Sequence, residues 1–127
     1  MNTTEHKKIL IIDDDEDFLS ILDMKFKKEG FLVVIAKDGE EGIRIAKSEN
    51  PNIILLDMAL PKKGGIEVLE DLKSDEVSKN IPVIILSNFS EDENIKKATS
   101  LGATDYFIKA DSSILEIFEK VQKIVSK

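Results

Sequence analysis

Short apolar runs alternate with amphipathic segments along this chain, and this alternation restricts the possible folds more than any other feature. Five such runs are present, at residues 8–12, 31–36, 52–56, 81–86 and 105–108. Four consecutive apolar residues, 53–56, are typical of a strand that is buried on both faces. This run ends in Asp57, and an ionised carboxylate at the tip of a buried strand is costly unless a charged or hydrogen-bonding partner meets it there.

The segments between the apolar runs carry helical spacing and helix-end signals. Phe18, Leu19, Leu22 and Phe26 share one face of a helix, and Gly30 follows as its stop signal. A second helix is predicted from a start at Asp38-Gly39 and a stop before Pro51, and a third from the spacing of Ile66, Leu69 and Leu72. A capping box at Ser90 to Glu93 predicts the start of a fourth, which carries Ile95, Ala98 and Leu101. A cap at Ser112 or Ser113 predicts a fifth over 114–125. Each predicted strand is therefore followed by a predicted helix.

Five β-then-α units with continuous apolar strands predict an α/β fold, a doubly wound parallel sheet covered by helices on both faces. Right-handed crossovers leave two main topologies, a Rossmann-like half and the flavodoxin-like strand order 2-1-3-4-5. No linker or low-complexity tract interrupts the pattern, so a single domain is expected over residues 1–127. Met1 to about His6 are expected to form a frayed N-terminus, and no functional role is assigned to His6.

Composition argues against several functional classes. No apolar run approaches the ~18 residues of a membrane span, and the absence of cysteine excludes a disulfide framework or a thiolate metal site. Acidic residues outnumber basic ones by 25 to 18, for a net charge of −7. This balance argues against a nucleic-acid-binding surface, because neutralisation of phosphates by Lys and Arg dominates such affinity. We expect a cytoplasmic protein that binds neither nucleic acid nor membrane.

Polar side chains stand at the ends of four of the five predicted strands. The first strand ends in three aspartates at 13–15, the third in Asp57, the fourth in Ser87 and the fifth in Lys109. Ligands bind at the carboxyl edge of such a sheet where the strand order reverses, which in the order 2-1-3-4-5 lies between the first and third strands. Taken singly, each has an ordinary interpretation: Asp14 or Asp15 would cap the following helix, and Asp57 would be a satisfied structural carboxylate. Ser87 would be a turn hydroxyl and Lys109 a solvated lysine. Taken together, they predict a site at this edge.

Three carboxylates, from Asp13, Asp14 and Asp57, would repel one another at this edge unless a cation lies among them. Oxygen ligands without His or Cys suit a hard ion, and few ligands with room for water suit Mg²⁺ better than Ca²⁺. The acidic spacing at 13–17 mimics the start of an EF-hand loop, but the glycine and the bidentate glutamate of that loop are missing. The sequence therefore predicts Mg²⁺ and excludes a calcium loop.

A carboxylate beside Mg²⁺ and an ammonium group is equipped to attack a phosphorus atom and form an aspartyl phosphate. Asp57 is the candidate nucleophile, and it needs no general base because a carboxylate is already deprotonated at neutral pH. The metal would neutralise the transferring group while Lys109 and Ser87 bind its remaining oxygens.

Four ordered motifs resemble the signatures of response-regulator receiver domains. They are Ile-Ile-Asp-Asp-Asp at 11–15, Leu-Leu-Asp-Met-Ala-Leu-Pro at 55–61, Ile-Leu-Ser at 85–87 and Asp-Tyr-Phe-Ile-Lys at 105–109. The resemblance covers essentially the whole chain and implies the strand order 2-1-3-4-5. It also implies Asp57 as the phospho-acceptor, Asp13 and Asp14 as the acidic pair of the metal site, Asp14, Asp57 and the Ala59 carbonyl as direct Mg²⁺ ligands, Ser87 and Tyr106 as the switch pair, and Lys109 as the family's invariant lysine. The implied phosphoryl donors are phosphohistidines of sensor histidine kinases or histidine phosphotransfer proteins.

The function that the resemblance implies is a phosphorylation-controlled binding switch. Such a protein is not an enzyme, although it assists its own phosphorylation and dephosphorylation. Its output surface would comprise the fourth helix, the fifth strand and the fifth helix. Because the chain ends at Lys127 directly after the last predicted helix, a stand-alone receiver is expected.

Three other functions are alternatives to this switch. A Mg²⁺-dependent phosphohydrolase would need a second aspartate where Ala59 stands. A flavin-binding module would need a Ser, Thr and Gly phosphate loop after the first strand, where residues 13–15 are acidic. A scaffold that keeps the fold but works without phosphorylation is the third alternative.

Three positions modify or depart from the family pattern. Ala110 stands where the family usually has proline after the lysine, and because a non-proline cis bond costs about 2.5 to 4 kcal/mol, a trans Lys109–Ala110 bond and a reshaped loop are predicted. Gly64 replaces a common acidic residue, which predicts a more mobile loop after Asp57. Phe89 is predicted to overhang the phosphorylation site and hinder attacking water, with a simple cover over the fourth helix as the alternative.

Overall fold

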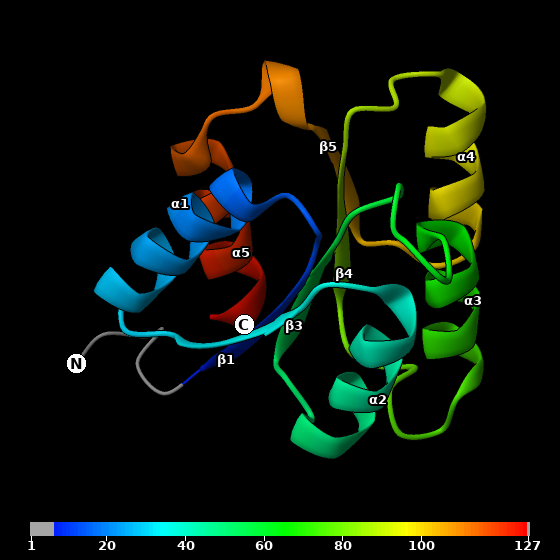
Figure 1. Ribbon diagram of the computed structural model, residues 1–127, viewed down its shortest axis with the longest axis horizontal. Coiled ribbons are helices and arrows are strands. Elements are labelled where there is room, and N and C mark those ends of the chain that lie inside the picture. Colours follow the sequence, from blue (N-terminus) through cyan, green and yellow to red (C-terminus); the bar gives the residue numbers. More distant parts are fainter. Residues whose placement is uncertain (1–6, 127) are drawn as a thin grey trace.

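A five-stranded parallel sheet forms the centre of the molecule, with helices on both of its faces (Figure 1). The computed structural model describes residues 7–126. The strands are β1 (Lys8–Ile12), β2 (Leu32–Ala36), β3 (Ile53–Leu56), β4 (Val83–Ser87) and β5 (Asp105–Ile108). The helices are α1 (Glu16–Lys28), α2 (Gly39–Glu49), α3 (Gly65–Ser74), α4 (Asp92–Ser100) and α5 (Ile114–Val125), and Lys109–Asp111 form a 3-10 turn, η1. The N-terminal expectations, including the one for His6, lie outside the described residues.

The strand order is β2-β1-β3-β4-β5, and every neighbouring pair is parallel. Helices α1 and α5 cover one face of the sheet, and α2, α3 and α4 cover the other (Figure 1). The predicted α/β fold and its strand order are therefore confirmed. The β1–β3 pair lies at the centre of the order reversal, which places the carboxyl ends of these two strands at the predicted position of the site.

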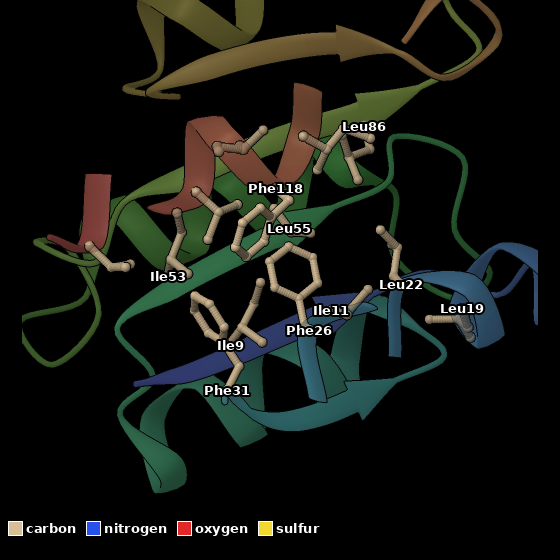
Figure 2. Close-up of a cluster of buried hydrophobic side chains, with 14 residues drawn as sticks. Ile9, Ile11, Leu19, Leu22, Phe26, Phe31, Ile53, Leu55, Leu86 and Phe118 are labelled. Atoms are coloured by element: carbon tan, nitrogen blue, oxygen red, sulfur yellow. The ribbon is translucent and has the colours of Figure 1, made fainter. Parts of the chain in front are cut away.

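Two hydrophobic cores flank the sheet and explain why its inner strands carry unbroken runs of apolar residues. Along β1, Ile9 and Ile11 belong to the core under α1 and α5, whereas Leu10 and Ile12 belong to the core under α2 and α3. Figure 2 shows the first core, in which Phe26 packs edge-on against Phe31 (ring centroids 5.1 Å apart) and tilted against Phe118 (5.8 Å). A strand covered on both sides has no solvent-facing position, so its run of apolar residues is unbroken.

Helix starts follow the predicted caps with one exception. The caps are Asp15 for α1, Asp38 for α2 and Ser113 for α5, the last with a complete capping box. The predicted capping box at Ser90 is wrong, because α4 begins at Asp92 with Glu91 as its N-cap and no side-chain cap. The Phe89 carbonyl accepts a hydrogen bond from the Tyr106 hydroxyl (2.7 Å), which holds the chain at the sheet edge until just before the helix.

Within the described residues every peptide bond is trans, so the prediction for Lys109–Ala110 is confirmed. The chain leaves β5 through the single 3-10 turn η1 and reaches α5 at Ile114. None of the described helices has the length and apolar content that crossing a bilayer would require.

Candidate functional site

Asp13 and Asp57 lie next to each other at the carboxyl edge of the sheet, each one residue beyond its strand. The backbone ladder continues past the strand ends, since the Asp13 N–H donates to the Ala36 carbonyl (3.0 Å) and the Asp57 N–H to the Ile12 carbonyl (2.9 Å). The sheet itself therefore fixes the backbone beneath both carboxylates. From this point the chain runs to α1 on one face and to α3 on the other, which opens the edge above β1 and β3.

Three carboxylates converge at this edge, as predicted. One oxygen from each of Asp13, Asp14 and Asp57 lies within 4.8 Å of the other two. The Asp13 residue is 2% exposed and Asp57 is 6% exposed, whereas Asp14 is open to solvent. Of the two candidate caps for α1, Asp15 takes that role by accepting the Phe18 N–H (3.2 Å), and Asp14 joins the acidic cluster.

Lys109 brings a positive charge to the cluster from the end of β5. Its Nζ lies 2.7 Å from Asp13 Oδ2 and 3.6 Å from Asp57 Oδ2, and its side chain is 9% exposed. The same Nζ lies 4.6 Å from the centroid of the Phe18 ring. This aromatic contact was missed from the sequence, where helical spacing indicated only that Phe18 shares the apolar face of α1. One ammonium facing three carboxylates leaves the edge with a net negative charge.

The carboxyl of Asp57 has a strongly raised pKa. Burial raises the pKa of its carboxyl from 3.8 to about 6, with a further rise from the charge of Asp13. The ammonium of Lys109 and the backbone N–H groups of Ala59 and Met58 oppose this rise without cancelling it. A buried carboxylate whose pKa remains high beside an ammonium is a site that would gain from additional positive charge.

The two predicted switch residues are connected through the loop between β4 and α4. Ser87 is buried at the end of β4, and its Oγ accepts the Phe89 N–H (3.0 Å). The Tyr106 hydroxyl donates to the Phe89 carbonyl (2.7 Å). Burial raises the pKa of the Tyr106 phenol, so it remains a donor at neutral pH. Phe89 is 42% exposed, and its predicted overhang of the site stays a prediction.

The loop after Asp57 depends on one glycine that the sequence did not single out. A Cβ at Gly65 would lie 2.5 Å from both the Asp57 carbonyl oxygen and the Met58 Cα, so only glycine permits this close approach of α3. At Gly64 the nearest atom to an added Cβ is 3.8 Å away, and its backbone is in an ordinary extended conformation. Ala59 donates its N–H to Asp57 Oδ1 (3.4 Å). The ligand role of its carbonyl and the mobility of the loop stay predictions.

Comparison with known proteins identifies the family. The response regulator receiver domain model matches residues 9–122. The chain belongs to this family. Receiver domains are phosphorylation-controlled switches of two-component signalling, generally not enzymes, and they take the phosphoryl group from histidine kinases or phosphotransfer proteins.

Two curated relatives illustrate the range of proteins that carry such a domain. Sporulation initiation phosphotransferase F of Bacillus subtilis (strain 168) is 36% identical to this receiver domain, over 93% of this chain and 93% of its own length. The alkaline phosphatase synthesis transcriptional regulatory protein PhoP of the same organism is 34% identical over 96% of this chain and 50% of its own length. The chain thus spans about half the length of several curated relatives that it matches.

Solved structures give the same result. The Francisella response regulator 1452 receiver domain shares 31% identity with a TM-score of 0.87, covering 94% of this chain and 97% of that one. A chain of the CheX-CheY-BeF3-Mg²⁺ complex from Borrelia burgdorferi shares 28% identity with a TM-score of 0.85, covering 95% of this chain and 90% of that one.

Proposed function

We propose that this receiver domain accepts a phosphoryl group on Asp57 from a phosphohistidine of a sensor histidine kinase or a histidine phosphotransfer protein. The phosphoryl group then changes the binding surface formed by α4, β5 and α5. The observation that carries the proposal is the convergence of the Asp13, Asp14 and Asp57 carboxylates with the Lys109 ammonium. Buried like charges weaken a fold, so a scaffold that works without phosphorylation would have no use for them.

In the transfer step a carboxylate oxygen of Asp57 forms a bond to phosphorus and the phosphorus–nitrogen bond of the donor breaks. The donor nitrogen keeps the electron pair of that bond and takes up a proton from solvent. Lys109, whose Nζ lies 3.6 Å from Asp57 Oδ2, is placed to bind one oxygen of the transferred group. Ser87, at the end of the neighbouring strand β4, carries a hydroxyl that can donate to a second oxygen.

Mg²⁺ is the cofactor that the donor set fits. The cluster offers only oxygen atoms, two of its carboxylates are buried and the third is open to water, which suits a small hard cation with a partial water shell. We assign its binding to Asp13, Asp14, Asp57 and the Ala59 carbonyl. When bound, the ion supplies positive charge that offsets the charge of the transferring group. The Mg²⁺ named in the Borrelia burgdorferi complex supports this choice.

The switch step would run through the loop between β4 and α4. A phosphoryl oxygen that draws the Ser87 hydroxyl toward Asp57 also displaces the Phe89 N–H, which is bonded to that hydroxyl oxygen. Phe89 in turn holds the Tyr106 hydroxyl through its carbonyl. Movement of Ser87 would therefore be passed through Phe89 to Tyr106 and would bias the position of Tyr106 on the output surface.

Ala59, two residues after Asp57, offers no general acid, which favours a switch over a phosphohydrolase. The two cores of residues 7–126 share one sheet, which supports a single domain across residues 1–127. We propose that the protein is located in the cytoplasm.

Incubation with Mg²⁺ and a small acyl phosphate or phosphoramidate, followed by intact mass measurement, tests the proposal. We expect the wild type to gain one phosphoryl group and Asp57→Asn to gain none. Asp17→Asn, which removes an exposed carboxylate from the first turn of α1, is the matched control and should behave as the wild type. A folded wild type that gains no phosphoryl group from either donor would favour the phosphorylation-independent scaffold.

A further inference from the structure

Three side chains from three different segments of the chain lie around the Lys109 ammonium. Two are the carboxylates of Asp13 and Asp57, at 2.7 and 3.6 Å, and the third is the ring of Phe18, whose centroid lies 4.6 Å from Nζ. The Lys109 side chain is 9% exposed, so these neighbours, more than water, determine where the ammonium lies. Phe18 has no part in the proposed chemistry, yet it supplies one of the three contacts.

The ring is held in place by the start of α1. Asp13 Oδ1 accepts the Asp15 N–H (3.0 Å), and Asp15 Oδ1 accepts the Phe18 N–H (3.2 Å). The Phe18 ring then faces Lys109 Nζ, which returns to Asp13 through the other carboxylate oxygen. These four contacts form a closed circuit, so the cap of α1 fixes both the acidic corner and the aromatic ring that faces the ammonium.

We propose that Phe18 is a positioning residue for phosphoryl transfer, because its ring keeps the Lys109 ammonium between Asp13 and Asp57. The ring face attracts a cation, and it does so more strongly where water is excluded. Lys109 is the first residue of η1, a turn without buried residues, so the turn does not enclose its flexible four-carbon stem. Without the ring, Lys109 can move toward its closer partner Asp13 and away from Asp57.

The consequence for transfer rests on the proposed phosphorylation of Asp57, whereas the ring contact does not. Misplacing a reacting or binding group by about 1 Å can cost up to about 100-fold in rate. Loss of the cation–π contact should cost less than this upper value. We expect Phe18→Leu to slow phosphorylation about tenfold, equivalent to about 1.4 kcal/mol in the activation free energy. Leucine retains apolar bulk against the core but has no π face. Phe18→Tyr retains the π face and should stay within about twofold of the wild type.

The first test reads the ring contact without phosphorylation. In metal-free protein labelled with ¹³Cε-lysine, with the Lys109 signal assigned by Lys109→Arg, the ε-methylene protons of Lys109 should be shifted upfield by the ring current. The shift should persist in Phe18→Tyr and disappear in Phe18→Leu. A Lys109 signal that is unchanged in Phe18→Leu would overturn the proposal.

The second test is a double-mutant cycle on the phosphorylation rate, with the melting temperature recorded for every variant. In a Lys109→Met background, Phe18→Leu should have no further effect, because the residue acts through the ammonium. An equal slowing in both backgrounds, or no slowing in the wild-type background, would overturn the positioning role. If the wild type is inert to every donor, the proposed function fails, and the NMR measurement still decides the ring contact.

Discussion

Replacing Asp57 by Asn is expected to stabilise the metal-free protein at neutral pH. Burial and the charge of Asp13 raise the pKa of Asp57 from 3.8 to about 6, against the lowering effect of Lys109 and of two backbone N–H groups. A carboxyl with a higher pKa in the folded state than in the unfolded state weakens the fold once it ionises. This penalty is absent below the unfolded value, where the group is protonated in both states, grows as the pH rises from 3.8 to about 6, and reaches its full size above about 6.

The size of the effect follows from the two pKa values. Each pKa unit is worth about 1.36 kcal/mol, so the whole difference amounts to about 3 kcal/mol if the carboxylate were fully shielded. The edge is open on the side of Asp14, and solvent screening there reduces the expected penalty to about 1 to 2 kcal/mol. For a chain of this size that corresponds to a rise in melting temperature of about 4 to 8 °C. Asparagine has nearly the same shape, and its carbonyl can accept the Ala59 N–H.

Urea unfolding in EDTA, from about pH 3 to about pH 8, measures the effect. The stability gap between Asp57→Asn and the wild type should be near zero at the acid end and reach its plateau above pH 7. Glu70→Gln, which changes an exposed carboxylate on α3, serves as the control and should show no such pH dependence. A variant less stable than the wild type at pH 8, or a gap that does not change with pH, would refute the reasoning. Added Mg²⁺ should stabilise the wild type more and narrow the gap.

Three further predictions concern the loops and helix starts around the site. Gly65→Ala should lower the free energy of unfolding by about 1 to 3 kcal/mol in urea, because its Cβ would lie 2.5 Å from backbone atoms, whereas Gly64→Ala should be nearly neutral; equal effects would contradict this. Phe89→Ala should lose its phosphoryl group faster than the wild type when the donor is removed, and equal rates by mass measurement would rule out the overhang. Ser113→Ala should cost about 1 kcal/mol by removing the capping box of α5, and Ser112→Ala, its neighbour, should cost less when both are melted in parallel.

Residue spacing predicted a doubly wound parallel sheet and most of its polar edge, but it left two strand orders open, and the resemblance to receiver domains implied the order 2-1-3-4-5. The inner strands are covered on both faces, so their apolar runs are continuous and their ends are visible in the sequence. Parallel strands bring their carboxyl ends to one edge, and this rule places Asp13, Asp57, Ser87 and Lys109 together without any coordinates. The distances from Lys109 to the two aspartates confirm that these three residues meet, whereas the chemical roles of all four residues stay predictions.

Local signals failed where long-range contacts competed with them. The same Ser-x-x-Glu pattern occurs at Ser90 and at Ser113, but only Ser113 caps a helix. At Ser90 the preceding residue is engaged by a long-range contact, because the hydroxyl of Tyr106, which is distant in sequence, donates to the Phe89 carbonyl just before the start of α4. A capping pattern reports what four consecutive residues can do, and it contains no information about a hydroxyl that arrives from another strand.

The alternation of apolar runs and amphipathic segments was enough to predict the strands, their burial and the acids that follow them. A repeating pattern of this kind is a local property of the chain. Only the tertiary structure decided three other features. They are the role of Asp15, and not Asp14, as the cap of α1, the need for glycine at position 65, and the contact of Phe18 with Lys109. Each of these depends on how α1 and α3 pack against the edge of the sheet, and that packing joins residues that share no local pattern.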